Sequence, residues 1–203
     1  MRDSDIAYSK IKELIMTAEL RPGQLIIESE LMDKFKMGRT PIREALNRLS
    51  WEEQVRTIPR KCILVSEFPL EKMESIYQLR ATLTDLEGEL ATKKSTKEEI
   101  ENLRKIVEDM KNEKESVKKV MLERDFHRNI SKMTKNTILE TSMNNITDFC
   151  VRFMFLNKEH LDTINDSVIK ECEEIIDSIE SDNVDRTINL LQAHVAEFKK
   201  LFV

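Results

Sequence analysis

The sequence contains few residues that interrupt helices and few that favour large β-sheets. Its 203 residues include only 3 glycines and 4 prolines, and aromatic residues make up 5% of the chain. Charged residues make up 35%. This composition favours a mainly α protein with little sheet and argues against a β architecture.

Two further absences concern location and redox state. No apolar run approaches the roughly 18 to 20 residues of a membrane span, and Asp3 and Asp5 stand near the N-terminus, where a signal peptide would lead into its apolar core. The cysteines, Cys62, Cys150 and Cys172, are odd in number and widely spaced, which argues against a disulfide framework. We therefore expect a cytoplasmic protein with reduced thiols and no membrane partner.

The net charge of −5 is unevenly distributed along the chain. Residues 1–68 contain 12 Lys/Arg and 11 Asp/Glu, whereas residues 69–203 contain 21 Lys/Arg and 27 Asp/Glu. Within residues 34–61, 8 basic residues stand against 3 acidic ones, a local charge of +5 that suits a phosphate backbone. A linker at Glu67-Phe68-Pro69 divides the chain into two predicted domains, residues 1–68 and residues 69–203.

Three helices followed by a β-hairpin are predicted in the N-terminal domain. Apolar residues at helical spacing, interrupted by a turn at Pro22-Gly23, place the helices, and two short β-prone runs around a basic tip place the hairpin. The predicted helices are residues 6–15, residues 28–35 and a third beginning near Arg39, and the predicted strands are residues 55–58 and 62–65.

The third helix carries the most informative segment, Gly-Arg-Thr-Pro-Ile-Arg-Glu-Ala-Leu at residues 38–46. Thr40 can cap a helix, and Pro41 at the first helical position loses no hydrogen bond, because an N–H there has no helical partner. Arg39 and Arg43 then lie about one turn apart, and apolar residues at helical spacing cover the opposite side. Taken alone, the segment is also typical of an ordinary surface helix.

Together with the Pro-Gly turn and the hairpin, this segment resembles the winged helix-turn-helix of the GntR family of bacterial transcription regulators. The resemblance covers about residues 8–65 and implies arginine contacts with base edges or phosphates in the major groove of operator DNA. Three departures concern the wing: Glu53-Gln54 replaces a usual Gly-Leu, and Cys62 replaces a usual wing-tip glycine. The DNA-binding residues that the resemblance implies are Arg39, Thr40, Arg43, Ser29, Gly38, Arg60 and Lys61.

About six helices in an antiparallel bundle are predicted for the C-terminal domain. Amphipathic periodicity separates them, and Thr96 with Glu99 fits a capping box at the start of the second. The expected fold is therefore an N-terminal winged helix-turn-helix followed by this bundle. The predicted ranges are 70–93, 96–114, 116–133, 136–157, 165–181 and 183–202.

A Glu-His pair stands on one face of the third of these helices, since Glu123 and His127 are four residues apart. The pair alone is typical of a solvated surface. Combined with Cys172 and His194, it resembles the FCD domain of the FadR subfamily, in which an Asp, a His and two later histidines hold a metal. The resemblance implies a divalent metal held by Glu123, His127, Cys172 and His194. The carboxylate, thiolate and imidazole donors favour zinc, although two replaced ligands also fit a site that has lost its metal.

The same resemblance implies a small carboxylic acid as effector. Arg80 matches an arginine on the first helix of the domain and can bind a carboxylate through two hydrogen bonds. The alternative is an exposed arginine paired with Asp85 or Glu87. Asn129 and Arg152 are further candidates for effector binding.

These features lead to one functional hypothesis and two alternatives. We expect a homodimeric, non-enzymatic regulator that binds a pseudo-palindromic operator through two recognition helices roughly 34–36 Å apart. We expect a repressor that leaves its operator DNA when the ligand binds. Activation of transcription is the open alternative. The alternatives are a zinc hydrolase with Glu123 as base and a helical metal-binding or scaffold protein that does not bind DNA.

Overall fold

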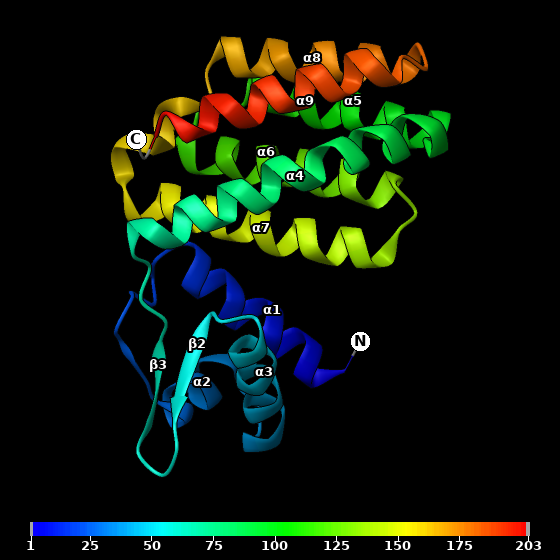
Figure 1. Ribbon diagram of the computed structural model, residues 1–203. Helices are drawn as coiled ribbons and strands as arrows, with labels where there is room; N and C mark the ends of the chain where they lie inside the picture. Colours follow the sequence, from blue (N-terminus) through cyan, green and yellow to red (C-terminus); the bar gives the residue numbers. More distant parts are fainter. Residues whose placement is uncertain (1, 202–203) are drawn as a thin grey trace. The chain divides into compact units, whose positions relative to one another are not determined.

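The computed structural model describes residues 2–201, and the chain divides into two compact units between Pro69 and Leu70. The first unit contains three helices and a small sheet (Figure 1). The sheet is antiparallel in the order β1-β3-β2, with Ile58 opposite Cys62 in the hairpin. Its elements are α1 (Asp3–Met16), β1 (Leu25–Ile26), α2 (Glu28–Phe35), α3 (Arg39–Trp51), β2 (Val55–Ile58) and β3 (Cys62–Val65).

The core of this unit is formed by the apolar faces of its helices and by inward-facing residues of the sheet. Ile11, Ile42 and Leu49 are completely buried. They recur at helical spacing on α1 and α3, which pack against each other. This arrangement confirms the predicted winged helix-turn-helix. The sequence analysis did not place β1, whose two residues are too short to show an alternating pattern.

The start of α3 differs from the prediction. The N-cap is Gly38, which has extended backbone, and no side chain caps the helix. Thr40 is therefore the second helical residue rather than the cap, and Pro41 is the third rather than the first. The shift costs no hydrogen bond, because the first four N–H groups of a helix have no partner within it. The Thr40 hydroxyl therefore does not cap the helix.

Two residues near the wing, Glu53 and Arg60, have a left-handed backbone conformation. Glu53, directly after the C-cap of α3, has φ 56°, and Arg60, in the hairpin turn, has φ 59°. Glycine is favoured at such positions because it has no Cβ. The prediction that Cys62 occupies the wing tip is wrong, since Cys62 is the first residue of β3 and pairs with Ile58. The left-handed tip residue is Arg60.

The second unit is a bundle of helices, as predicted. α4 packs against α6, α7 and α9, while α5 packs against α6 and α8 (Figure 1). Thr96 and Glu99 form the predicted capping box. A short 3-10 helix, η1 (Lys158–Thr163), was not predicted. The α-helices are α4 (Leu70–Lys94), α5 (Lys97–Asn112), α6 (Ser116–Met133), α7 (Thr137–Leu156), α8 (Asp166–Glu180) and α9 (Val184–Lys199). None of the helices in residues 2–201 combines the length and apolarity needed to cross a membrane.

Candidate functional site

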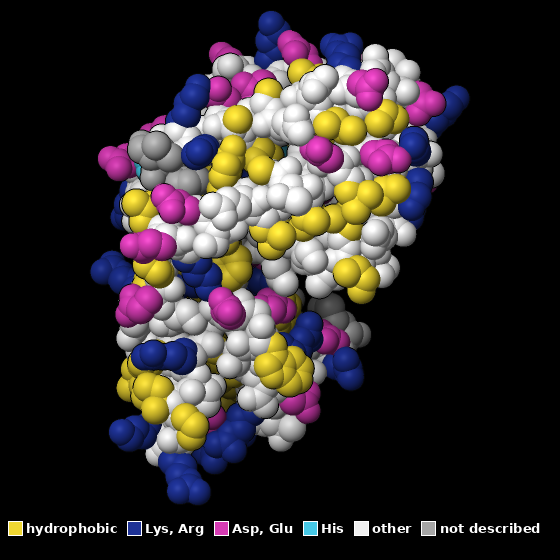
Figure 2. All heavy atoms as spheres, in the orientation of Figure 1, with side chains coloured by type: hydrophobic (Ala, Val, Ile, Leu, Met, Phe, Trp, Pro, Cys, Tyr) yellow, Lys and Arg dark blue, Asp and Glu magenta, His cyan; other side chains and the backbone are white. Residues whose placement is uncertain are grey.

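The first unit presents basic side chains from α3 and from the hairpin. Arg39 and Arg43 lie in the first two turns of α3, with side chains 65% and 58% exposed. Arg60 and Lys61 are exposed at the turn between β2 and β3. Lys and Arg side chains gather at the hairpin end of this unit in Figure 2. Both groups of cations are therefore available to a phosphate backbone.

Glu28, the first residue of α2, contacts two of the arginines of α3, Arg39 and Arg43. Its carboxylate oxygens both lie 3.0 Å from Nε of Arg43, and one lies 3.9 Å from Nε of Arg39. The turn between α2 and α3 thus brings an acid beside the predicted base-contacting groups. The smaller candidates for DNA backbone contact are also exposed: Ser29 follows Glu28 in the first turn of α2, and Gly38 and Thr40 lie at the start of α3.

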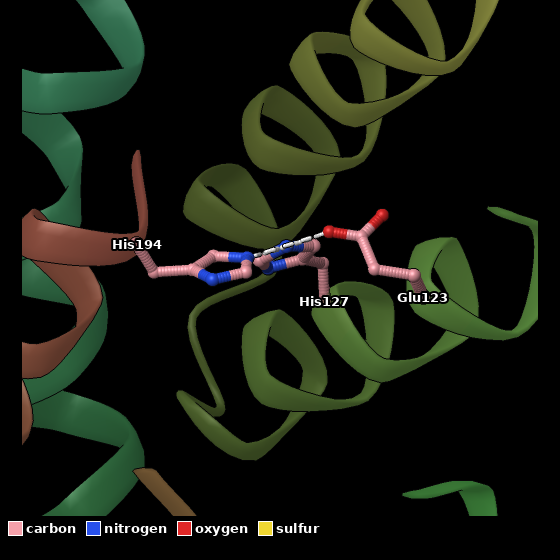
Figure 3. Close-up of side chains that lie close together, drawn as sticks. All are labelled: Glu123, His127 and His194. Carbon is pink, nitrogen blue, oxygen red and sulfur yellow. Dashed lines mark hydrogen bonds and ion pairs between the residues drawn. The ribbon is translucent and has the colours of Figure 1, made fainter. Parts of the chain in front are cut away.

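In the second unit, three side chains from two helices converge. Glu123 and His127 come from α6, and His194 reaches them from α9 (Figure 3). Nε2 of His127 lies 2.7 Å from Oε1 of Glu123, and Nε2 of His194 lies 3.2 Å from Nε2 of His127 and 3.4 Å from that same oxygen. All three residues are buried. We call Glu123, His127 and His194 the triad.

The triad fits a divalent metal. Two ligands each about 2.0–2.2 Å from one ion lie roughly 3.0–3.4 Å apart at tetrahedral or octahedral angles, which is close to the separations found here. A carboxylate with two imidazoles is also a donor set that transition metals accept. The bundle thus has a Glu-His cluster that could hold a metal ion.

Cys172 does not belong to this cluster, so its predicted role as a ligand is not supported. Its side chain is fully buried among the core residues of α8, and its Sγ is not among the converging donor atoms in the described part of the chain. Burial raises the pKa of its thiol well above the usual value, which disfavours the thiolate that a metal needs. Its neighbour Glu171, which the sequence analysis missed, lies with Oε2 2.9 Å from Nδ1 of His194. A carboxylate in this position orients a metal-binding imidazole.

Protonation within the triad is set by burial and by mutual contacts. Burial lowers the pKa of His127 to about 4, and the charge of Arg80 acts in the same direction. Burial would raise the pKa of Glu123, but contacts with His127 and His194 outweigh it and hold that pKa well below the usual value. For His194, burial is outweighed by hydrogen bonds with Glu123 and Glu171, which raise its pKa. The neutral His127 and ionised Glu123 are the forms that bind cations.

Arg80, on α4, lies beside the triad and is only 4% exposed. One terminal nitrogen lies 3.0 Å from Nε2 of His127, and the other donates to Sγ of Cys150 at 3.4 Å. Its Nε is buried and has no hydrogen-bond partner among the described residues. The alternative of an exposed arginine paired with an acid of α4 is therefore wrong.

The two acids proposed in that alternative have other partners. Asp85 accepts a hydrogen bond from Gln192 at 2.6 Å, and Glu87 accepts one from Ser131. Burial raises the pKa of Glu87 to about 7, so this carboxyl carries a proton over much of the neutral range.

A pocket of about 310 Å³ opens beside Arg80 and the triad. Its volume lies at the lower end of the range for small-molecule sites. Its walls come from α4, α6, α7, α8 and α9 and from the residues after η1, which the sequence analysis did not single out. The lining residues are Arg80, Glu123, Met154, Thr163, Ile164, Asn165, Ser167, Val168, Glu171, His194, Glu197, Phe198, Lys200 and Leu201.

Asn129 and Arg152 do not line this pocket, so the structure does not support their predicted role in effector binding. Asn129 lies on the other side of α6, where its amide donates to the backbone of Asp125 and accepts from Asn102. Arg152 is 1% exposed within α7. Helical spacing alone did not distinguish these positions from residues that face the pocket.

Comparisons with known proteins agree with both units. The family described as "Bacterial regulatory proteins, gntR family" matches residues 4–65, and the FCD domain matches residues 75–197. The transcriptional regulator YdhC of Bacillus subtilis is 24% identical over 194 residues, covering 92% of this chain and 85% of YdhC. The Nta operon transcriptional regulator of Aminobacter aminovorans is 30% identical over 137 residues, covering 66% and 65% of the two chains.

A solved structure shares the fold along the whole chain. Escherichia coli McbR/YncC superposes with a TM-score of 0.82 at 16% sequence identity, covering 100% of both chains. The matched families consist of transcription regulators, a class that is not enzymatic. The chain therefore belongs to the GntR family of bacterial transcription regulators and, with its helix-turn-helix unit and its FCD domain, to the FadR-like subfamily.

Proposed function

We propose that this GntR-family DNA-binding regulator is a homodimeric repressor that leaves its operator when a small carboxylic acid binds in the pocket of the FCD domain. The observation that carries the DNA-binding part is the exposure of Arg39 and Arg43 on the first two turns of α3, beside a hairpin with Arg60 and Lys61 at its tip. An arginine fork can contact guanine N7 and O6 together. Thr40, Ser29 and Gly38 are proposed to contact phosphates.

A dimer is supported by an apolar strip along α4. Leu79 and Leu86 are 50% and 41% exposed, and the half-buried Leu83 and Leu90 continue the same row. A row of apolar side chains is visible along this helix in Figure 2. The spacing alternates between three and four residues, which is the spacing of a helix-helix interface. We propose that the strip packs against its own copy.

The helix dipole and the basic last turn of α4 favour an antiparallel arrangement of the two copies. The last turn contains Lys93 and Lys94, whereas Glu71 and Lys72 in the first turn offset each other. Antiparallel packing keeps the two basic ends apart, and it also aligns the helix dipoles favourably. A two-fold axis through the dimer would match a pseudo-palindromic operator.

The effector is proposed to place its carboxylate at Arg80. This guanidinium is buried, lines the pocket and has an Nε atom without a partner in the described chain. A buried donor without an acceptor is costly, so an anion that reaches it gains a strong charge-assisted hydrogen bond. The contact also adds a counter-charge to a buried cation.

A divalent metal, with zinc favoured, is proposed to bind at Glu123, His127 and His194. When bound, such an ion would supply a Lewis-acid site for a carboxylate oxygen. Glu171 would hold His194 in the orientation that presents Nε2. The chain itself supplies the three donors, the guanidinium of Arg80 and the shielding of the site from water.

Release of DNA requires that the acid bind one arrangement of the dimer more tightly than the other. The shift in operator affinity can be no larger than this difference. Because the proposed partner is bacterial operator DNA, the protein would act in the cytoplasm.

Selection of bound fragments from a random DNA pool tests the DNA-binding and dimer parts together. The expected product has two inverted half-sites separated by about one helical turn. An enriched sequence without symmetry would contradict the dimer, and the absence of any enriched sequence would contradict specific operator binding.

A further inference from the structure

The pocket is chemically divided, and this division limits the acids that fit it. Arg80, Glu123 and His194 contribute charged and polar groups to its lining, whereas Met154, Ile164 and Phe198 contribute apolar surface. We infer that the effector is a monocarboxylic acid with an apolar body, and that Glu171 and Glu197 select against acids with a second carboxylate. This inference rests on the proposal that the pocket is the effector site.

Among the side chains that line the pocket in the described chain, Arg80 is the buried cation available to the anionic group of the ligand. Arg80 is 4% exposed and keeps one N–H without a partner in residues 2–201. The other cation in the lining, Lys200, is already bonded to both carboxylate oxygens of Glu197 at 2.6 and 2.7 Å. A single carboxylate therefore satisfies Arg80, whereas a second carboxylate would have to compete with Glu197 for the only other Lys or Arg side chain in the described lining, Lys200.

Acidic groups in the same lining make a second carboxylate unfavourable. Glu123, Glu171 and Glu197 all line the pocket. Glu171 bonds to His194 at 2.9 Å, which fixes its charge beside the cavity. Like charges brought together in a partly enclosed pocket repel each other more strongly than they do in water.

The body of the ligand meets aliphatic and aromatic side chains. Met154 and Ile164 are buried at 3% and 7% exposure, and Val168 and Leu201 continue the same wall. The ring of Phe198 lies 5.8 Å from the Arg80 guanidinium, so it adjoins the anion-binding end. Apolar surface in these places favours methylene or aromatic groups over hydroxyl groups, because buried hydroxyl groups need partners.

The size of the cavity limits the length of the acid. At about 30 Å³ for each non-hydrogen atom, a pocket of 310 Å³ holds on the order of ten such atoms. Each methylene transferred from water into an apolar site strengthens binding by about fourfold. Affinity should therefore rise with chain length up to this limit and then stop rising.

Calorimetric titration of the full-length protein with two series of acids tests the inference. The first series runs from butyrate to octanoate, and the second contains the dicarboxylates with the same numbers of carbons. We expect affinity to rise by about fourfold per methylene in the first series. Each dicarboxylate should bind at least roughly tenfold more weakly than the monocarboxylate of equal length, because of the like charges.

Two variants show whether the acids bind where we infer. Val168→Ser alters only the apolar wall of the pocket. The rise in affinity with chain length should therefore become smaller, while the affinity for butyrate changes little. Glu197→Gln should reduce the difference in affinity between each monocarboxylate and the dicarboxylate of equal length. If neither variant changes the pattern, the acids bind elsewhere and the inference is wrong.

The outcomes separate the inference from the proposed function. If dicarboxylates bind more tightly than monocarboxylates and lose this binding in Arg80→Gln, the inferred apolar monocarboxylate is wrong, while the pocket stands as the effector site. If no acid of either series binds and none releases operator DNA, both the inference and the proposed effector class fail.

Discussion

Nε of Arg43 lies 3.0 Å from both carboxylate oxygens of Glu28, so the predicted base-contacting arginine is held by an acid from the preceding helix. Only Nε takes part in this contact. The two terminal nitrogens have no hydrogen bond to any described residue, and the side chain is 58% exposed. We infer that Glu28 positions Arg43 and leaves its terminal nitrogens for DNA.

Replacing Glu28 should therefore weaken specificity more than total affinity. Glu28→Ala removes the support of Arg43, which should lower the operator affinity relative to random DNA by about two- to fivefold, the range of an exposed ion pair. Binding to random DNA should rise slightly, because one negative charge is lost from the DNA-facing surface. Fluorescence anisotropy with both duplexes at one salt concentration measures the ratio. Equal changes on both duplexes would contradict the positioning role.

Arg60 combines backbone strain with a predicted DNA contact. Its φ of 59° is left-handed, which costs a residue with a Cβ about 1 kcal/mol. Arg60→Gly should raise the free energy of unfolding by roughly that amount and should weaken operator binding. Arg60→Ala is the control, because it removes the charge and keeps the strain. Urea denaturation and anisotropy report the two effects, and equal stability of the Gly and Ala variants would rule out strain at the tip.

Glu87 should make the stability of the FCD domain depend on pH. Burial raises its pKa from about 4.5 to about 7 in the folded state, opposed by the hydrogen bond from Ser131 and the charge of Arg80. The folded state thus binds more protons than the unfolded state, so stability is full below about pH 4.5 and falls as pH rises to about 7. The total loss should be on the order of 3 kcal/mol.

Glu87→Gln removes this titration and keeps a side chain of the same shape. The wild-type protein should lose stability between pH 5 and pH 8, while the variant should lose less over the same interval. Urea denaturation at these two pH values, followed by circular dichroism, gives the comparison. Equal losses of stability in the wild-type protein and the variant would mean that Glu87 is ionised in the folded state throughout this pH range.

Metal binding should depend on Glu171 but not on Cys172. Glu171→Gln keeps a hydrogen-bond partner for His194 but removes the charge, so zinc affinity should fall by about 10- to 100-fold. His127→Ala should abolish stoichiometric binding, and Cys172→Ser should leave it unchanged, because Sγ is not among the converging donors. Competition with a chromophoric chelator measures the affinities. Loss of zinc binding in Cys172→Ser would show that the Cys172 thiol is a metal ligand.

Amphipathic periodicity was enough to predict the α-helices, and two short β-prone runs around a basic tip were enough to predict the hairpin. Leu103, Val107 and Met110, for example, recur at helical spacing on α5 and are all buried. Shorter elements such as β1 and η1 have too few residues for a periodic pattern. They follow from tertiary pairing, which a single sequence does not reveal.

The site was less predictable than the fold, because the direction of each side chain decides whether that residue belongs to the site. Cys172 and Glu171 are neighbours on α8, and successive helical residues differ by about 100° in direction. Cys172 faces the core and Glu171 faces His194. The predicted ligand Cys172 therefore lies outside the cluster, while its neighbour Glu171 contacts it. Arg80 was named as a candidate, yet its burial and its contact with His127 required the packed bundle.

Operator binding by an arginine-deficient variant tests the central claim most directly. The protein carrying both Arg39→Ala and Arg43→Ala should bind the selected operator at least about 100-fold more weakly than wild type, since each good arginine-guanine contact contributes roughly 1–3 kcal/mol. Its circular dichroism should be unchanged, because both side chains are exposed. Lys105→Ala, an exposed cation on α5, is the matched control and should bind normally. Undiminished operator binding by the folded double variant would contradict recognition through α3.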